Sequence, residues 1–175
     1  GTRVAVAVDI ADDVSGAAPV PRNGVVAIYD AADLGAAPTL VETGNHPDMV
    51  TFSADGSRIF VANEGEAEDG YADQPRGGVT VIDVTATPPT ATTVDFTAFD
   101  GQEAALRAAG VRIFPAQSAS RDLEPEYIAE SEDGATLFVS LQEANAVAVF
   151  DVASQSFTDI RPLGTTDHSV PGFEL

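Results

Sequence analysis

The sequence predicts an all-β fold in which one four-stranded antiparallel meander repeats along the chain. A hairpin with an Asp-Gly turn occurs at residues 47–61 and again at 125–139. Each copy is followed by a further run of β-branched residues, at 78–84 and 146–152. A strand-rich unit that repeats in this way is typical of the blades of a β-propeller. We therefore expect a β-propeller segment of about three four-stranded antiparallel blades.

The expected strands follow one pattern in every blade. The first blade, about residues 3–44, lacks its innermost strand, and its other strands are expected at 3–10, 24–30 and 39–43. The strands of the second blade, about 47–96, are expected at 49–53, 58–63, 78–84 and 91–96. Those of the third, about 125–164, are expected at 127–131, 136–141, 146–152 and 157–161. An aspartate near the end of each third strand marks the shared register: Asp30, Asp83 and Asp151.

One short helix is predicted in the long connection between the second and third blades, residues 97–123. Asp100 is the expected N-cap, because Glu103 follows it by three residues in a capping-box arrangement. An alanine-rich run comes next, and Gly110 is the expected stop. The alternative is an irregular loop.

An open fan of three blades does not close a ring, since propellers have about four to eight blades. The fan would leave apolar sheet surface uncovered on each side. We therefore expect residues 1–175 to form one partial propeller, a fragment of a longer one. It would be completed by the remaining blades, by further copies of the chain or by a partner.

The charge of the chain is strongly acidic, with 28 acidic residues, 8 basic residues and a net charge of -20. Such a surface repels nucleic acid and anionic membranes, so no nucleic-acid partner is expected, and it attracts divalent cations and basic ligands. The alternative is that the acidity only keeps a secreted protein soluble. No apolar run approaches the roughly 18 residues of a membrane span, so no membrane insertion is expected in this segment. The absence of cysteine excludes disulfides and thiolate metal sites.

The long connections are expected to leave the same face of the propeller, because antiparallel strands alternate in direction. The short Asp-Gly turns would lie on the opposite face. The long-loop face would carry residues 11–23, 64–77, 97–123 and the tail from 165. Long loops on one face of a rigid scaffold are where binding or catalysis concentrates.

Acidic residues are frequent at the long-loop face, in segments 63–69 and 122–126. Asp48 and Glu126 occupy the same position in two blades, each after a proline at the start of the innermost strand. Two such carboxylates raise each other's pKa or share a cation, and hard oxygen ligands suit Ca²⁺ or Mg²⁺. The alternatives are that these acids cap backbone amides or form a solvated rim. His46 and His168 fall on the same face, but the linear Asp-His-Ser at 167–169 does not define a catalytic triad.

Four motifs carry a family resemblance: VANEGE at 61–66, GVRIF at 110–114, DLEPEYIA at 122–129 and DHS at 167–169. In this order they resemble the bacterial choice-of-anchor family of surface or secreted β-propeller proteins. That family is similar to the eukaryotic mesenchyme-specific cell-surface glycoprotein, and some members carry alkaline-phosphatase or phytase-like labels. The resemblance covers about residues 4–172. It implies a location outside the cell or on its surface, and additional blades.

The resemblance also implies roles for individual residues. Phytase-type propellers use acidic, calcium-lined faces, which implies Ca²⁺ ligands among Glu64, Glu66, Glu124 and Glu126, beside Asp48. The implied contacts to a phosphate or other ligand are Arg76, Arg112, Arg121 and His168. We expect an extracellular module whose acidic face binds Ca²⁺ and a protein or small phosphorylated ligand. The alternatives are a calcium-dependent phosphoesterase, in which the cations activate a water, and a structural surface module without metal.

Overall fold

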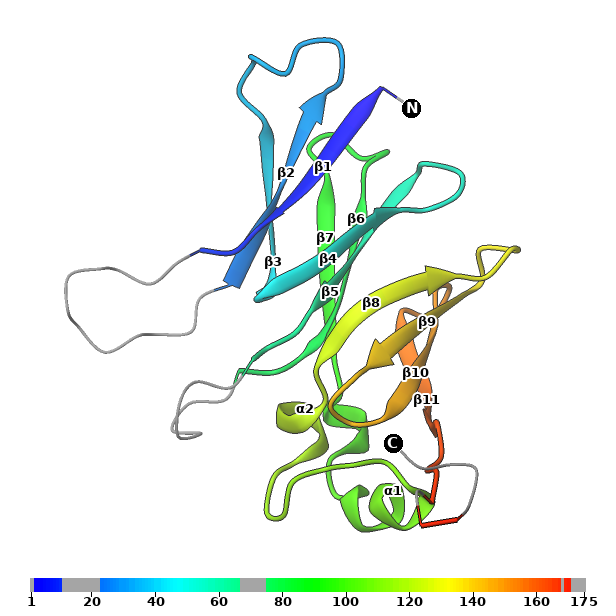
Figure 1. Ribbon diagram of the computed structural model, residues 1–175. Coiled ribbons are helices and arrows are strands. Elements are labelled where there is room, and N and C mark those ends of the chain that lie inside the picture. Colours follow the sequence, from blue (N-terminus) through cyan, green and yellow to red (C-terminus); the bar gives the residue numbers. More distant parts are fainter. Residues whose placement is uncertain (1, 11–22, 67–74, 168, 171–175) are drawn as a thin grey trace, which may run out of the picture.

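The computed structural model describes residues 2–10, 23–66, 75–167, 169 and 170, and it shows an all-β protein with three antiparallel sheets (Figure 1). The first sheet contains β1 (Arg3–Val8), β2 (Asn23–Asp30) and β3 (Thr39–Asn45). The second contains β4 (Pro47–Phe52), β5 (Arg58–Asn63), β6 (Gly78–Asp83) and β7 (Thr90–Asp95). The third contains β8 (Pro125–Glu130), β9 (Thr136–Leu141), β10 (Ala146–Asp151) and β11 (Ser156–Pro162).

Each sheet is a meander in which strands that are consecutive in the chain are neighbours in the sheet. The all-β class and the expected strands are confirmed, and no strand end differs from its expected position by more than two residues. The described strands form three open sheets, and β1 is an edge strand with β2 as its only neighbour in the sheet.

The shared register follows from the strand pairing. Arg3 faces Asp30, Arg58 faces Asp83 and Thr136 faces Asp151, so β1, β5 and β9 are equivalent strands. The aspartates begin the turns that follow, because each carboxylate accepts a backbone N–H two or three residues later, at 2.7–2.9 Å. A turn requirement therefore explains the repeated aspartate.

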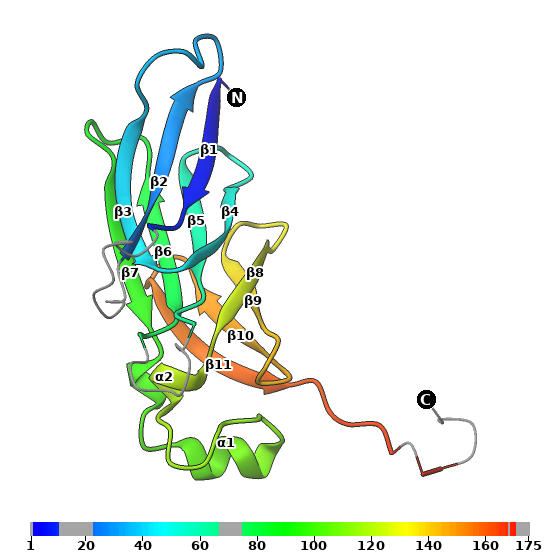
Figure 2. The ribbon, with the colours of Figure 1, turned by 60° about the vertical axis from the view of Figure 1, so that its left-hand side comes forward.

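The three sheets lie in a row with the second sheet in the middle (Figures 1 and 2). One apolar core, which includes Val26, Val41 and Ile59, joins the first sheet to the second. A larger core, which includes Phe60 and Leu137, joins the second sheet to the third. The strands at the start of the meanders are neighbours across the row, since β4 contacts both β1 and β8.

The connection between the second and third sheets contains a 3-10 turn η1 (Thr97–Phe99), helix α1 (Glu103–Ala109) and the single helical turn α2 (Ala119–Asp122). The expected helix is confirmed as α1, and so is its stop. Gly110 has a φ of 109°, and its N–H donates to the carbonyls of the last turn.

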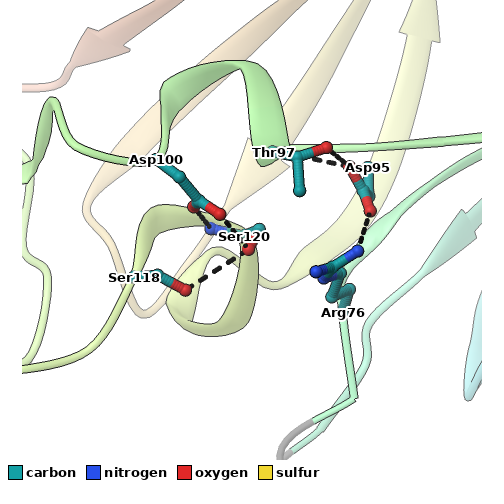
Figure 3. Close-up of polar contacts among 6 residues, drawn as sticks. All are labelled: Arg76, Asp95, Thr97, Asp100, Ser118 and Ser120. Atoms are coloured by element: carbon teal, nitrogen blue, oxygen red, sulfur yellow. Dashed lines mark hydrogen bonds and ion pairs between the residues drawn. The ribbon is translucent and has the colours of Figure 1, made fainter.

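The predicted N-cap is wrong. Gln102 caps α1, without a side-chain hydrogen bond, and the carboxylate of Asp100 turns to α2 instead (Figure 3). Asp100 accepts the backbone N–H of Ser120 at 2.8 Å and its hydroxyl at 2.9 Å. Glu103 accepts the N–H of Ala119 at 3.1 Å. Both acids of the pattern thus satisfy the N-terminal amides of a second, distant helical turn.

Candidate functional site

Acidic side chains from the second and third sheets gather at the end of the molecule opposite the β4–β5 and β8–β9 hairpin turns. Two come from the segment after β5, two from the start of β8, one from β4 and one from the β9–β10 turn. The negative charges of other acids in the group raise the pKa values of Glu64, Glu124 and Glu126. We call this group the acidic cluster: Asp48, Glu64, Glu66, Glu124, Glu126 and Glu143.

His46 lies between two members of the acidic cluster. Its Nε2 is 3.6 Å from an oxygen of Glu64, and its Nδ1 is 3.6 Å from an oxygen of Glu66. The backbone supports this placement, because the N–H of Glu64 donates to the carbonyl of His46 at 2.9 Å. His46, Asp48 and Glu64 each offer one ligand atom, and these three atoms lie within 4.8 Å of one another.

Close backbone approach at Gly77 brings the two acidic segments together. A Cβ at this position would lie 2.2 Å from the carbonyl oxygen of Leu123 and 2.8 Å from that of Glu64. It would also lie 2.6 Å from the ring of Pro125. Only glycine lets the chain before β6 pass between the segment after β5 and the start of β8. The position of the glutamates thus depends on a residue without a side chain.

The electrostatics of the cluster favour protonation. Burial raises the pKa of Glu124 to about 7, and the charges of Glu64 and Glu143 add to the effect. Burial also raises the pKa of Glu126 to about 7, helped by a side-chain hydrogen bond to Glu143. Burial likewise raises the pKa of Glu64, an effect that His46 opposes. At neutral pH the cluster therefore holds protons that isolated carboxylates would release.

These shifts predict a pH dependence of stability. We expect the free energy of unfolding, without divalent cations, to fall as the pH rises from 4.5 toward about 7. In this window the folded chain binds more protons than the unfolded chain, so each rise in pH favours unfolding. Aspartates with a lowered pKa, such as Asp55, have almost finished titrating where the window begins. Glu103, whose pKa is lowered from 4.5, opposes the fall only near the start of the window. Urea unfolding in a chelator across this pH range measures the effect.

A matched pair of variants separates the cluster from the general acidity of the chain. Glu126→Gln is expected to reduce the slope of stability against pH. Glu132→Gln, which removes an equal charge at the exposed β8–β9 turn, is expected to leave it unchanged. Equal slopes in the two variants would show that the cluster does not cause the dependence.

A small hollow of about 120 Å³ adjoins the cluster and is lined by Arg112, Phe114, Asp122, Glu124 and Glu143. The Arg112 guanidinium lies 6.0 Å from the centre of the Phe114 ring. The backbone N–H of Phe114 donates to Asp122 at 2.7 Å, which fixes this segment against α2. The hollow thus places one cationic side chain beside the carboxylates.

The structure brings together all five predicted metal ligands and one of the predicted anion-binding residues, Arg112. Arg76 instead pairs with Asp95 at the end of β7, 3.2 Å away (Figure 3). Arg121 is an exposed residue of α2. His168 and residues 68 and 69 of the predicted acidic segment lie outside the described residues.

Sequence reasoning missed Glu143 as a member of the site, and it placed His46 on the correct face without giving it a role. Glu143 lies in the β9–β10 turn, which occupies the same place in its sheet as the β5–β6 connection that carries Glu64. The alternation of strand direction already assigned that turn to the same end. The predicted site included only the long connections, so it omitted the short β9–β10 turn.

The fold and the site define an all-β protein of three antiparallel sheets with a carboxylate-rich end. The chain belongs to the choice-of-anchor I domain family, whose sequence profile matches residues 1–175. A choice-of-anchor domain indicates a cell-surface or secreted protein. A search of curated proteins found none that matches the chain. Among the helices of the described residues, none is both long enough and apolar enough to span a membrane.

Proposed function

We propose that this chain is a segment of an extracellular β-propeller whose acidic cluster binds a divalent cation, Ca²⁺. The end of the molecule that carries the acidic cluster would bind a ligand or a protein partner. The observation that carries the proposal is the convergence of six carboxylates, two of which have a pKa of about 7. Such crowding is unfavourable for the bare protein and becomes favourable around a dication.

The donor set supports a hard cation. Ca²⁺ takes about six to eight oxygen ligands in flexible geometry, and carboxylates bind it in one- or two-oxygen modes. Asp48, Glu66 and Glu143 are exposed, whereas Glu64, directly after β5, and Glu126, in β8, are partly buried. Carboxylate oxygens outnumber the single imidazole, which favours calcium over zinc.

The propeller assignment rests on the repeated register. Three meanders with equivalent pairing lie in a row, and the first strand of one complete meander contacts that of the next. Stacked four-stranded sheets of this kind form propeller blades. The arrangement also explains why loops after equivalent strands reach the same end.

Calcium titration of the thermal transition tests the proposed cation. At a Ca²⁺ concentration of about 100 times Kd, binding adds about 2.7 kcal/mol to the stability of the folded chain. For a chain of this size that raises Tm by about 5–10 °C. We expect Glu126→Gln to weaken Ca²⁺ binding by about tenfold, about 1.4 kcal/mol. The isosteric amide keeps the shape of the side chain and removes one ligand charge.

The same variant distinguishes a cation site from backbone capping. Without calcium at pH 8, Glu126→Gln is expected to be as stable as the parent or more so, because it removes a repelling charge. If the Glu126 carboxylate capped backbone amides instead, its replacement would lower the stability of the folded chain by about 1 kcal/mol. Glu132→Gln serves as the control and is expected to retain the full calcium response. An unchanged Tm with calcium or chelator would contradict the proposal.

A second function, calcium-dependent phosphoester hydrolysis, is favoured by the position of Arg112. Its side chain lines the hollow that Glu124 and Glu143 also line. A phosphate bound beside the carboxylates would meet the guanidinium on one side, and a bound cation would polarise it on the other. Turnover of p-nitrophenyl phosphate or phytate that requires calcium and falls in Arg112→Gln would support hydrolysis. Calcium binding without turnover would leave the binding module as the function.

A further inference from the structure

A buried polar network lies in the second sheet beside the acidic cluster. Asn63, the last residue of β5, is 0% exposed, and so is Thr80 of β6. The amide nitrogen of Asn63 donates to the Thr80 hydroxyl at 2.9 Å and to the carbonyl of Gly78 at 3.2 Å. Its amide oxygen accepts the backbone N–H of Gly44 at 2.9 Å. The Thr80 hydroxyl also pairs with that of Thr93 at 2.7 Å. Both polar atoms of the Asn63 side chain therefore have partners.

The third sheet shows that the fold does not require this network. Leu141 ends β9 as Asn63 ends β5, and the two residues are equivalent in register. The positions of Thr80 and its partner on β7 are taken by Ala148 and Ile160. These three apolar residues are at most 6% exposed. Burying an amide and hydroxyls costs more than burying apolar groups, so the network of the second sheet indicates a role besides folding.

Asn63 joins three segments that meet beside the acidic cluster. Its amide oxygen holds Gly44, two residues before His46, and its amide nitrogen holds Gly78, the first residue of β6. Gly44 lies directly against the amide, because a Cβ at this position would be 2.7 Å from the Cγ atom of Asn63. Glu64 follows Asn63 in the chain. One side chain thus fixes the end of β3, the end of β5 and the start of β6 relative to one another.

His46 depends on such support because its backbone is strained. Its φ is 49°, in the left-handed region that residues other than glycine adopt at a cost. Before His46, the chain is held where Gly44 donates to Asn63. After it, Pro47 pairs with Asn63 across β4 and β5, and the N–H of Glu64 donates to the His46 carbonyl at 2.9 Å. Strained conformations persist only where the surrounding structure determines them.

We propose that Asn63 is a positioning residue of the acidic cluster, which holds His46 and Glu64 in the arrangement that receives a dication. The role of the cation rests on the proposed function, whereas the arrangement itself rests on the contacts of Asn63. Asn63 acts through the backbone of the two segments that it joins. Loss of a group that orients metal ligands lowers metal affinity by about 10–100-fold.

Asn63→Leu in chain 1–175 tests this proposal, because it introduces the residue that the third sheet carries at the same position. We expect the Kd for Ca²⁺, measured by isothermal titration calorimetry on the folded chain, to rise about tenfold. Without calcium, we expect the NMR signals of the His46 imidazole to move, because the ring loses its fixed place between Glu64 and Glu66. His168→Gln identifies those signals, since the chain has 2 histidines. A purely structural role of Asn63 would lower stability and leave both readouts unchanged.

Thr80→Val is the matched control, since it removes a hydroxyl from the same network and keeps the contact between Asn63 and Gly44. It is expected to retain the calcium affinity and the His46 signals of the parent. Far-UV circular dichroism checks the fold. If Asn63→Leu does not fold, Gly44→Ala takes its place with the same expectations, because its methyl group displaces the same amide from the other side.

A parent-like Kd or parent-like His46 signals in the folded Asn63→Leu variant overturn the proposal. Equal changes in Thr80→Val also overturn it, because they would show a general loosening of the core. A parent chain that binds no calcium contradicts the proposed function alone, and the His46 signals then decide the role of Asn63.

Discussion

Gly77→Ala is expected to destabilise the chain by about 3 kcal/mol and to abolish the proposed calcium binding. The added methyl group would lie 2.2 Å from a backbone oxygen of Leu123 and 2.8 Å from that of Glu64. Neither atom can move by a rotamer change, so the backbone must shift. Because this glycine holds the two acidic segments together, the shift separates Glu64 from Glu124 and Glu126.

Urea unfolding and calcium titration of the same variant measure both effects. Gly35→Ala is the matched control, because its new Cβ would meet only an Asp33 oxygen at 3.5 Å, an ordinary contact. We expect this control to match the parent within about 0.5 kcal/mol and to bind calcium normally. Parent-like stability in Gly77→Ala would show that the close approach is not required.

The second large effect is expected from Phe96→Ala, at about 3–5 kcal/mol. Phe96 follows β7 and is 0% exposed in the core that joins the second and third sheets. Its ring stacks on Phe157 of β11 with 4.1 Å between centroids, and Phe157 meets Phe150 edge-on at 5.2 Å. Truncation leaves a cavity between two sheets that the other rings cannot fill.

Chemical denaturation of Phe96→Ala and Phe96→Leu separates cavity formation from loss of the aromatic ring. Leucine keeps most of the apolar volume, and its cost is expected to be below about 1.5 kcal/mol. If both variants lose the same stability, the stacked ring contributes the energy and the cavity does not. If neither loses any, the core between the sheets does not hold the fold together.

The strands could be predicted because their signals are local. Alternating β-branched residues set each strand, and Asp-Gly turns set the β4–β5 and β8–β9 hairpins. Asp30, Asp83 and Asp151 each begin a turn through their own carboxylate. The error at Asp100 has the opposite origin. A carboxylate has several amides within reach, and the N–H of Ser120, which is distant in sequence, took the place of the local cap.

The site could be predicted only in outline. Strand direction placed Glu64 and Glu126 at one end, and the structure shows their charges acting on each other. The sequence pattern could not place His46 between Glu64 and Glu66, since that position depends on a backbone φ of 49° at His46. Nor could it reveal the approach at Gly77, which involves three segments far apart in the chain.

Anomalous scattering from a crystal soaked with a lanthanide, a mimic of Ca²⁺, tests the central claim most directly. The account predicts a strong peak bounded by carboxylates of Asp48, Glu64 and Glu126, which disappears in Glu126→Gln. A map without a peak at this end, or with its only peak beside the hairpin turns, would contradict the proposed cation site.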